Sequence, residues 1–362
     1  MSQSPVSATP TAVYAFTPRG ATLGRRIATD LGGELYLPRR LRDSLPPGLP
    51  AIPFDSLSEL MSELFHTCPR HVFIAAAGVA VRAAAPHLRG KVEDPAVVVL
   101  DQEGRFCISL LSGHLGGANA LARDIAARVG AQAVVTTATD AAGLPALDEI
   151  GPRLGLRISR FQAAKAVSAM LLAGERPQLF DPLGVLSQAH LDRNLFSPVL
   201  NPASWNSDLP GVWVHWTLAP ERGLGLHPPC LIAGVGCRRG TDGEEILELI
   251  RKTFAANGLA LEALAGLASI AAKADEPGLL WAAEQLGTPL TFFTPDQLAG
   301  VRVPSPSPLV RKHMGVDSVC EAAALLAARS NDLLVLKTRT ARATLAVAVS
   351  SWSASGPAAP NT

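Results

Sequence analysis

The sequence is poor in aromatic residues and has no long hydrophobic run. Only 5% of its 362 residues are aromatic although 48% are hydrophobic, so we expect cores built mainly from Ala, Val, Leu and Ile. No apolar run reaches the roughly 18 residues that a membrane span needs. Residues 1–11 are rich in Ser, Thr and Pro and lack the basic-then-apolar pattern of a signal peptide. We therefore expect a soluble, cytoplasmic protein with no membrane partner.

The sequence also has no large excess of charge of either sign and no pair of cysteines with C-x-x-C spacing. The formal net charge is +1, with no polybasic tract, whereas a nucleic-acid-binding surface needs a strongly basic face or arm. The five cysteines are an odd number and include no C-x-x-C pair, which argues against a disulfide framework and a zinc site. We expect no nucleic-acid partner and no metal site, and we interpret Cys107 and Cys320 as small core residues.

Strand-like and helix-like patterns alternate along the chain, which is long enough for two or three domains. This alternation predicts an α/β fold with mostly parallel sheets. We expect two α/β domains, residues 13–140 and 228–349, joined by a small irregular middle segment, residues 141–227. Residues 1–12 and 350–362 are predicted to be disordered.

Hydrophobic periodicity and capping residues locate the expected elements. In the first domain, strands are expected at 13–17, 34–37, 72–75, 96–101, 105–111 and 133–137, helices at 21–32, 56–65 and 118–129, and a loop at 46–53. In the middle segment we expect a helix at 162–172 and short strands near 179–180 and 212–216. In the second domain, strands are expected at 230–233, 269–271, 290–293, 333–337 and 343–349, and helices at 242–255, 277–286 and 319–328.

The most informative segment is SGHLGGAN, residues 112–119, between a predicted strand and a predicted helix. Backbone N–H groups and the helix dipole at such a junction favour bound anions. His114 can exchange a proton near neutral pH, and Asp140, at the polar end of the next strand, is expected to lie beside it. The alternative is that the glycines serve a tight turn and His114 caps the helix. The ligand contacts predicted here are Ser112, Gly113, Gly116, Gly117, Asn119, Thr136 and Thr137.

Three further places carry candidate binding residues. The spacing of Gly234, Gly236 and Gly240 is a weak relative of the dinucleotide-binding fingerprint, but Arg239 occupies the position of its third glycine. Arg238 and Arg239 suit carboxylate or phosphate binding, or they are solvated arginines of a tight turn. Lys273 with Glu276, and Gly78 with Arg82, follow predicted strands; their alternatives are a surface ion pair and a solvated helix face. A nucleotide-dependent oxidoreductase is the least favoured interpretation.

Several motifs taken together resemble the cobalt-precorrin-5A hydrolase family of cobalamin (vitamin B12) biosynthesis, the CbiG proteins. They lie at residues 78–82, 94–99, 108–119, 136–140 and 144–148. The runs at residues 234–240, 268–273, 276–279 and 315–324 resemble the C-terminal domain of that family, which also occurs as the separate protein CobE. The resemblance covers roughly residues 13–349.

The resemblance implies a hydrolase that acts on a carbon–carbon bond. Its substrate is a cobalt-containing tetrapyrrole with a δ-lactone; opening the lactone and releasing acetaldehyde converts cobalt-precorrin-5A to cobalt-precorrin-5B. No cofactor is expected beyond the cobalt that the substrate carries, and neighbouring corrin-pathway methyltransferases are candidate partners. The alternative is a non-catalytic carrier or assembly protein for tetrapyrrole intermediates.

Within that resemblance we assign roles to individual residues. His114 is expected to act as the general base, with Asp140 orienting it, and N–H groups near Gly116 and Gly117 as the oxyanion site. The expected anchors of the substrate's peripheral carboxylates are Arg82, Arg238 and Lys273.

Overall fold

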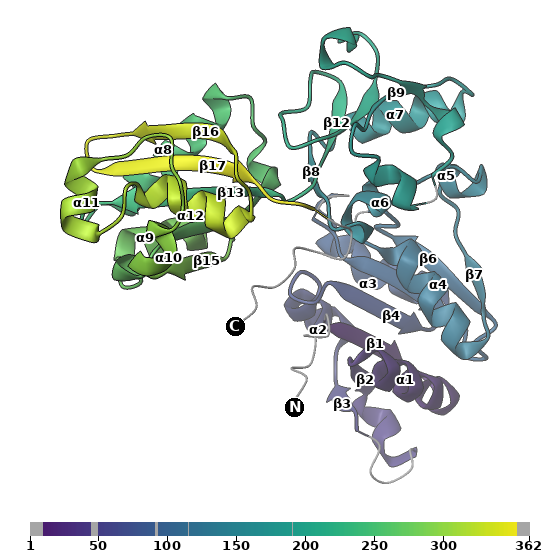
Figure 1. The fold of residues 1–362 in the computed structure, drawn as a ribbon. Coiled ribbons are helices and arrows are strands. Elements are labelled where there is room, and N and C mark those ends of the chain that lie inside the picture. Colours follow the sequence, from purple (N-terminus) through teal and green to yellow (C-terminus); the bar gives the residue numbers. More distant parts are fainter. Residues whose placement is uncertain (1–9, 45–49, 91–92, 115, 190, 353–362) are drawn as a thin grey trace. The chain divides into compact units, whose positions relative to one another are not determined.

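The computed structural model describes residues 10–44, 50–90, 93–114, 116–189 and 191–352 (Figure 1). The chain divides into two compact units, between Glu149 and Ile150. Three sheets, one in the first unit and two in the second, confirm the α/β class. Within the described ranges, no helix is both long and apolar enough to cross a membrane. The disorder expected at residues 1–9 and 353–362 lies outside the described residues.

The first unit is built on a seven-stranded sheet with the order β3-β2-β1-β4-β5-β6-β7. Its strands are β1 (Thr11–Ala15), β2 (Glu34–Pro38), β3 (Ile52–Phe54), β4 (Arg70–Ile74), β5 (Ala96–Leu100), β6 (Phe106–Leu111) and β7 (Gln132–Val134). Neighbours are parallel except β5 and β6, which form the expected antiparallel hairpin. Because of this reversal, β6 and β7 end at the edge of the sheet where β1–β5 begin.

Helices cover both faces of this sheet. The helices along this part of the chain are α1 (Pro18–Leu31), α2 (Leu57–Leu64), α3 (Ala77–Ala84), α4 (Ala118–Val129), the short α5 (Ala138–Ala141) and α6 (Leu147–Arg153), whose last residues belong to the second unit; η1 (Arg39–Ser44) and η2 (Ala85–His87) are 3-10 turns. Apolar residues of α1 and α4 pack on one face of the sheet, and those of α2 and α3 pack on the other. Local signals set the helix ends: the Ser56 side chain accepts from the Glu59 N–H, and Gly130 ends α4 in the left-handed conformation.

Two expectations for the first unit are wrong. Thr11 and Ala12, expected to be disordered, are buried in β1 and pair with β4, because the strand needs their ladder hydrogen bonds. Ile52 and Pro53, expected within a loop, belong to β3, whose backbone pairs with β2 although prolines precede it and lie within it. Residues 46–49 of that expected loop lie outside the described residues.

One buried polar pair lies inside the first unit's core. The His71 ring is fully buried, its Nδ1 lies 3.0 Å from the Tyr14 hydroxyl, and its Nε2 lies 2.9 Å from the Cys68 carbonyl oxygen. Since Nε2–H donates to that carbonyl, Nδ1 accepts from the tyrosine and the ring is neutral. Burial lowers the pKa of His71 to about 4, against the hydrogen bonds to the Phe65 and Cys68 carbonyls, which favour protonation.

The middle part of the chain has regular secondary structure. Five short strands form a sheet with the order β10-β9-β11-β12-β8; only β8 and β12 pair antiparallel. The strands are β8 (Arg157–Ser159), β9 (Gln178–Phe180), β10 (Ser197–Pro198), β11 (Gly211–Val214) and β12 (Gly223–His227); the helix is α7 (Ala163–Leu172), and the 3-10 turns are η3 (Val185–Ala189), η4 (Arg193–Leu195) and η5 (Pro202–Ser204). The expected irregular segment is therefore wrong. The expected helix at 162–172 and the short strands near 179–180 and 212–216 correspond to α7, β9 and β11. Strands β8, β10 and β12 were not predicted, because they are too short or, in β12, too rich in Gly for periodicity to reveal them.

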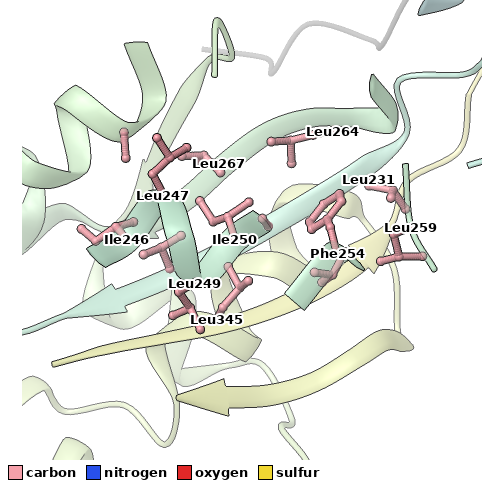
Figure 2. Packing of buried hydrophobic residues seen from close by; sticks show 14 of the residues in the cluster. Leu231, Ile246, Leu247, Leu249, Ile250, Phe254, Leu259, Leu264, Leu267 and Leu345 are labelled. Carbon is pink, nitrogen blue, oxygen red and sulfur yellow. The ribbon is translucent and has the colours of Figure 1, made fainter. Parts of the chain in front are cut away.

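The last sheet has the order β15-β14-β13-β17-β16, and β17 runs antiparallel to both of its neighbours, β13 and β16. Its strands are β13 (Leu231–Cys237), β14 (Leu264–Ile270), β15 (Leu290–Phe293), β16 (Leu333–Arg339) and β17 (Ala343–Val349). Its helices are α8 (Gly243–Ala256), α9 (Pro277–Gln285), α10 (Pro295–Ala299), α11 (Pro308–Met314) and α12 (Val319–Ala328), with 3-10 turns η6 (Leu261–Ala263) and η7 (Ala271–Lys273). Figure 2 shows Ile246, Ile250 and Phe254 of α8 packed among Leu231 and Leu264. Ser350, expected in the disordered tail, instead donates to the Cys230 carbonyl oxygen.

Gly234 and Gly236 lie inside β13 and do not form a turn after it. A Cβ at Gly234 would lie 1.9 Å from the Cys320 carbonyl oxygen of α12, so this glycine lets the helix backbone pack directly on the strand. The weak resemblance to a dinucleotide fingerprint therefore reflects helix–strand packing. Cys320 and Cys107 are buried, and burial raises the pKa of Cys107 to about 12, which confirms both as core residues.

Acid should destabilise the first unit through His71. The unfolded ring has a pKa near 6.5 and the folded one near 4, so the unfolded state binds the proton first. The stability is complete above about pH 6.5 and is lost as pH falls toward about 4, with about 2 kcal/mol lost between about pH 7 and about pH 5. Hydrogen exchange of β1 and β4 amides in the full chain measures this. We expect His71→Gln to flatten the pH dependence and the exposed His66→Gln to keep it; an unchanged slope in His71→Gln contradicts the assignment.

Candidate active site

The segment from Ser112 to Gly117 leaves β6 in a tight turn that starts α4. The Ser112 backbone is left-handed, with φ of 55°, a conformation that a non-glycine residue adopts at an energetic cost. The turn is closed by hydrogen bonds from the Ala118 N–H to the Ser112 carbonyl (3.1 Å) and from the Asn119 N–H to the Gly113 carbonyl (2.9 Å). This closure carries the chain from β6 to α4, with His114 between the two elements.

Two glycines of this turn are required by close approach. A Cβ at Gly116 would lie 2.4 Å from the Ser112 Cβ, and one at Gly113 would lie 2.7 Å from the Asn119 Oδ1. Both residues therefore let the turn pack on itself and on the side chain of Asn119. The Gly117 N–H donates to the His114 carbonyl oxygen at 2.8 Å, so in this conformation it serves the turn and not an oxyanion.

The carboxylate of Asp140 accepts hydrogen bonds from four side chains at this end of the sheet. His114 Nε2 lies 3.2 Å from Oδ2 and Asn119 Nδ2 lies 3.1 Å from the same oxygen; the Thr137 hydroxyl also donates to Oδ2, and Arg123 donates to Oδ1. β7 ends at Val134, so Asp140 lies on the following short helix α5 rather than at the strand end. The expected neighbourhood of His114 and Asp140 is present.

These donors keep Asp140 ionised. Burial by itself raises the pKa of a carboxyl, but the hydrogen bonds from Thr137, Arg123 and His114 outweigh it, and the pKa of Asp140 lies below its ordinary value. An ionised carboxylate only accepts, so His114 Nε2 carries the proton of this hydrogen bond. In the neutral imidazole the basic lone pair is then on Nδ1, and Asp140 fixes both tautomer and ring orientation.

Asn119 is fully buried, which assigns it to positioning rather than to ligand contact. Its Oδ1 accepts from the Ser109 hydroxyl of β6 at 2.7 Å, and its Nδ2 donates to Thr137 and Asp140. Sequence reasoning missed Ser109 and Arg123. Arg123 could have been predicted from the sequence, because it lies four residues after Asn119 and hence on the same face of α4.

Gly78 and Arg82 do not belong to this cluster. Gly78 lies near the start of α3, beyond the carboxyl end of β4, at the edge of the sheet opposite to the turn that holds His114. The guanidinium group of the exposed Arg82 lies against Gly78, 3.3 Å from the place of a Cβ. Thr136 is exposed in the link between β7 and α5.

The remaining predicted residues lie in the second unit, beside the last sheet. Lys273 and Glu276 form a buried ion pair of 3.0 Å, and the second oxygen of Glu276 accepts from the Gly240 N–H at 2.6 Å. Burial raises the pKa of the Glu276 carboxyl, but the hydrogen bonds from Lys273 and Gly240 bring it below its ordinary value. The surface-pair alternative is therefore wrong. Arg238, Gly236 and Lys273 line one cavity of about 760 Å³.

Replacing Arg123 should raise the pKa of Asp140. Arg123→Gln removes a charged donor from Oδ1 while burial still disfavours the carboxylate, so protonation becomes easier. Carboxyl carbon chemical shifts of Asp140, followed over an acid titration, measure the change. Arg128→Gln is the matched control, because Arg128 lies on the same helix and pairs with Asp124 at 2.8 Å instead. Equal Asp140 pKa values in the wild type and Arg123→Gln contradict the role given to Arg123.

Known protein families match most of the chain. Three family models match in order: Cobalamin synthesis G N-terminal at residues 59–140, Cobalamin biosynthesis central region at 145–228, and Cobalamin synthesis G C-terminus at 231–348. The chain is 37% identical over 331 residues to the cobalt-precorrin-5A hydrolase of Salmonella typhimurium, covering 87% of this chain and 91% of that protein.

Two further relatives agree. The cobalt-precorrin-5A hydrolase of Priestia megaterium is 32% identical over 306 residues, which cover 81% of this chain and 82% of the relative. Protein CobE of a Sinorhizobium species is 37% identical over 121 residues, 33% of this chain and 79% of that protein. The chain belongs to the cobalamin synthesis G family.

Proposed function

We propose that the protein is a cobalt-precorrin-5A hydrolase that opens the δ-lactone of its substrate and releases acetaldehyde, giving cobalt-precorrin-5B. Family membership and two relatives of this name, each matched over most of its length, support the substrate. The observation that supports the mechanism is the contact of 3.2 Å between His114 Nε2 and the ionised Asp140.

In the first step, His114 acts as the general base. Its Nδ1 takes a proton from a water molecule while the oxygen of that water attacks the lactone carbonyl carbon. The imidazolium then gives its proton to the ester oxygen as the C–O bond breaks. This leaves a carboxylic acid, which loses its proton to solvent, on one side chain and a hydroxyl group on the carbon that will leave, and it restores neutral His114. Asp140 stabilises the imidazolium that forms, because its carboxylate accepts a hydrogen bond from the Nε2–H group throughout the step.

The same base serves the second step. Removal of the new hydroxyl proton lets the carbon–carbon bond to the macrocycle break; the C–O bond becomes the carbonyl of acetaldehyde, and the electron pair passes into the conjugated ring. The ring is the electron sink, so the proposal needs no cofactor beyond the cobalt that the substrate carries. For the oxyanion of the first step, we assign the N–H of Gly116, since that of Gly117 is bound within the turn.

The rest of the proposal follows from family membership and from the sequence. The substrate is a cobalt corrinoid, and the neighbouring methyltransferases of the corrin pathway are the partners with which intermediates would be exchanged. A cytoplasmic location agrees with such a role. Arg82, Arg238 and Lys273 were expected to anchor carboxylates of the substrate; the buried ion pair of Lys273 favours a supporting role for that residue.

The first test is acetaldehyde release. Purified full-length protein is incubated with enzymatically generated cobalt-precorrin-5A without oxygen, and acetaldehyde is trapped with a hydrazine reagent. One acetaldehyde per substrate is expected. Binding of the corrinoid without acetaldehyde would favour the carrier alternative instead.

His114→Ala should lower the rate of acetaldehyde release by about 10²- to 10⁴-fold, the usual contribution of a general base. The acid limb of the pH–rate profile, where the base becomes protonated, should vanish with it. The control is His66→Ala, an exposed histidine elsewhere in the first unit. A folded His114→Ala protein with the full rate would remove His114 from the mechanism.

A further inference from the structure

The cavity of about 760 Å³ in the second unit opens at the carboxyl ends of β13 and β14. Its walls come from segments far apart in the sequence: the end of β13, η7 after β14, α11, the start of α12, and the turn between β16 and β17. In parallel sheets this edge is where ligands bind. The size lies within the range of small-molecule sites.

Positive charge dominates the wall. Six lysine and arginine residues contribute to it: Arg238, Arg239, Lys273, Lys337, Arg339 and Arg342. Among the described residues that line the cavity there is no aspartate or glutamate. Lys273 is neutralised by the buried Glu276 behind it. The other five form no ion pair with a carboxylate in the described part of the chain, so their charge is available to a ligand.

Two of these cations are held in place by the protein. Arg342 donates to the Gly240 carbonyl at 2.9 Å and to the Arg239 carbonyl at 3.2 Å. Lys337 donates through Nζ to the Ser305 carbonyl at 2.5 Å, and its backbone N–H donates to the buried Glu321 at 3.3 Å. Because these side chains are already ordered before a ligand binds, the entropic cost of binding is lower.

The remaining wall is suited to a flat, partly apolar anion. Val310, Met314 and Val319 contribute apolar surface. Ser318 and Val319 also form the start of α12, a helix of ten residues whose positive dipole end adds to the field. The Ser318 side chain makes no capping hydrogen bond to that helix.

We infer that this cavity binds an edge of a macrocycle that carries several carboxylates, with Arg238, Arg239 and Arg339 pairing with the carboxylates and the apolar wall contacting the ring. Guanidinium groups bind carboxylates through two parallel hydrogen bonds. The identity of the macrocycle rests on the proposed function; the preference for a flat polycarboxylate rests on the cavity alone. Of the two carboxylate anchors expected here from sequence, Arg238 keeps that role, and Lys273 supports the wall through Glu276.

The test uses uroporphyrin, a flat macrocycle ringed by carboxylates, titrated into the full-length protein and followed by its fluorescence. We expect saturable binding that weakens as salt rises. Arg238→Gln and Arg339→Gln should each weaken it about tenfold, the loss of one charge-assisted pair, and Arg339→Lys should recover part of the loss. The matched control is Arg251→Gln, an exposed arginine on α8 outside the cavity.

The outcomes separate this inference from the proposed function. The titration needs no turnover, so it tests the cavity even if the protein released no acetaldehyde. Undiminished binding in both cavity variants, or an equal loss in Arg251→Gln, would overturn the inference. Equally tight binding of a porphyrin with uncharged side chains would overturn it as well. If the binding test succeeds, the KM for cobalt-precorrin-5A should also rise in Arg339→Gln.

Discussion

The candidate active site depends on one half-buried carboxylate remaining ionised. Asp140 accepts from residues on three separate pieces of chain: His114 in the turn after β6, Asn119 and Arg123 on α4, and Thr137 before α5. Each donor offsets part of the cost of burying the charge. The same bonds fix the histidine tautomer, so the chemistry and the local fold rely on a single electrostatic balance.

The second unit also contains a buried carboxylate, but its position relative to the candidate binding site is different. There a carboxylate, Glu276, lies behind the cavity wall and satisfies both Lys273 and the Gly240 N–H. Its charge acts on Arg239 as well as on Lys273, but it forms no ion pair with the arginines that line the cavity in the described part of the chain. An acidic residue on the wall itself would have neutralised the site, whereas one behind the wall stabilises the loops that present the cations.

Sequence reasoning succeeded where the determining interactions are local. The expected strand at 290–293 and helix at 319–328 match β15 and α12 in the structure, because periodicity and flanking residues encode them. Sequence reasoning failed where the role of a residue is set by contacts with residues distant in the sequence. Gly234 was interpreted as part of a turn, although its role is set by α12 almost ninety residues later. Gly78 and Arg82 were expected to contact the same substrate as His114, but the reversal of strand direction after β5 places them at the opposite edge of the sheet.

The edge position of β7 gives the site a second role. This strand of three residues is last in its sheet and pairs only with β6 among the described strands, so ladder hydrogen bonds alone hold it weakly. Thr137 and Asp140, which follow it, connect it to α4. If the Asp140 charge were lost, β7 could detach and uncover β6, with the exposed Phe106, as a longer unpaired edge. Such edges recruit strands from other molecules. We therefore expect the Asp140 carboxylate also to protect the protein from edge-to-edge aggregation.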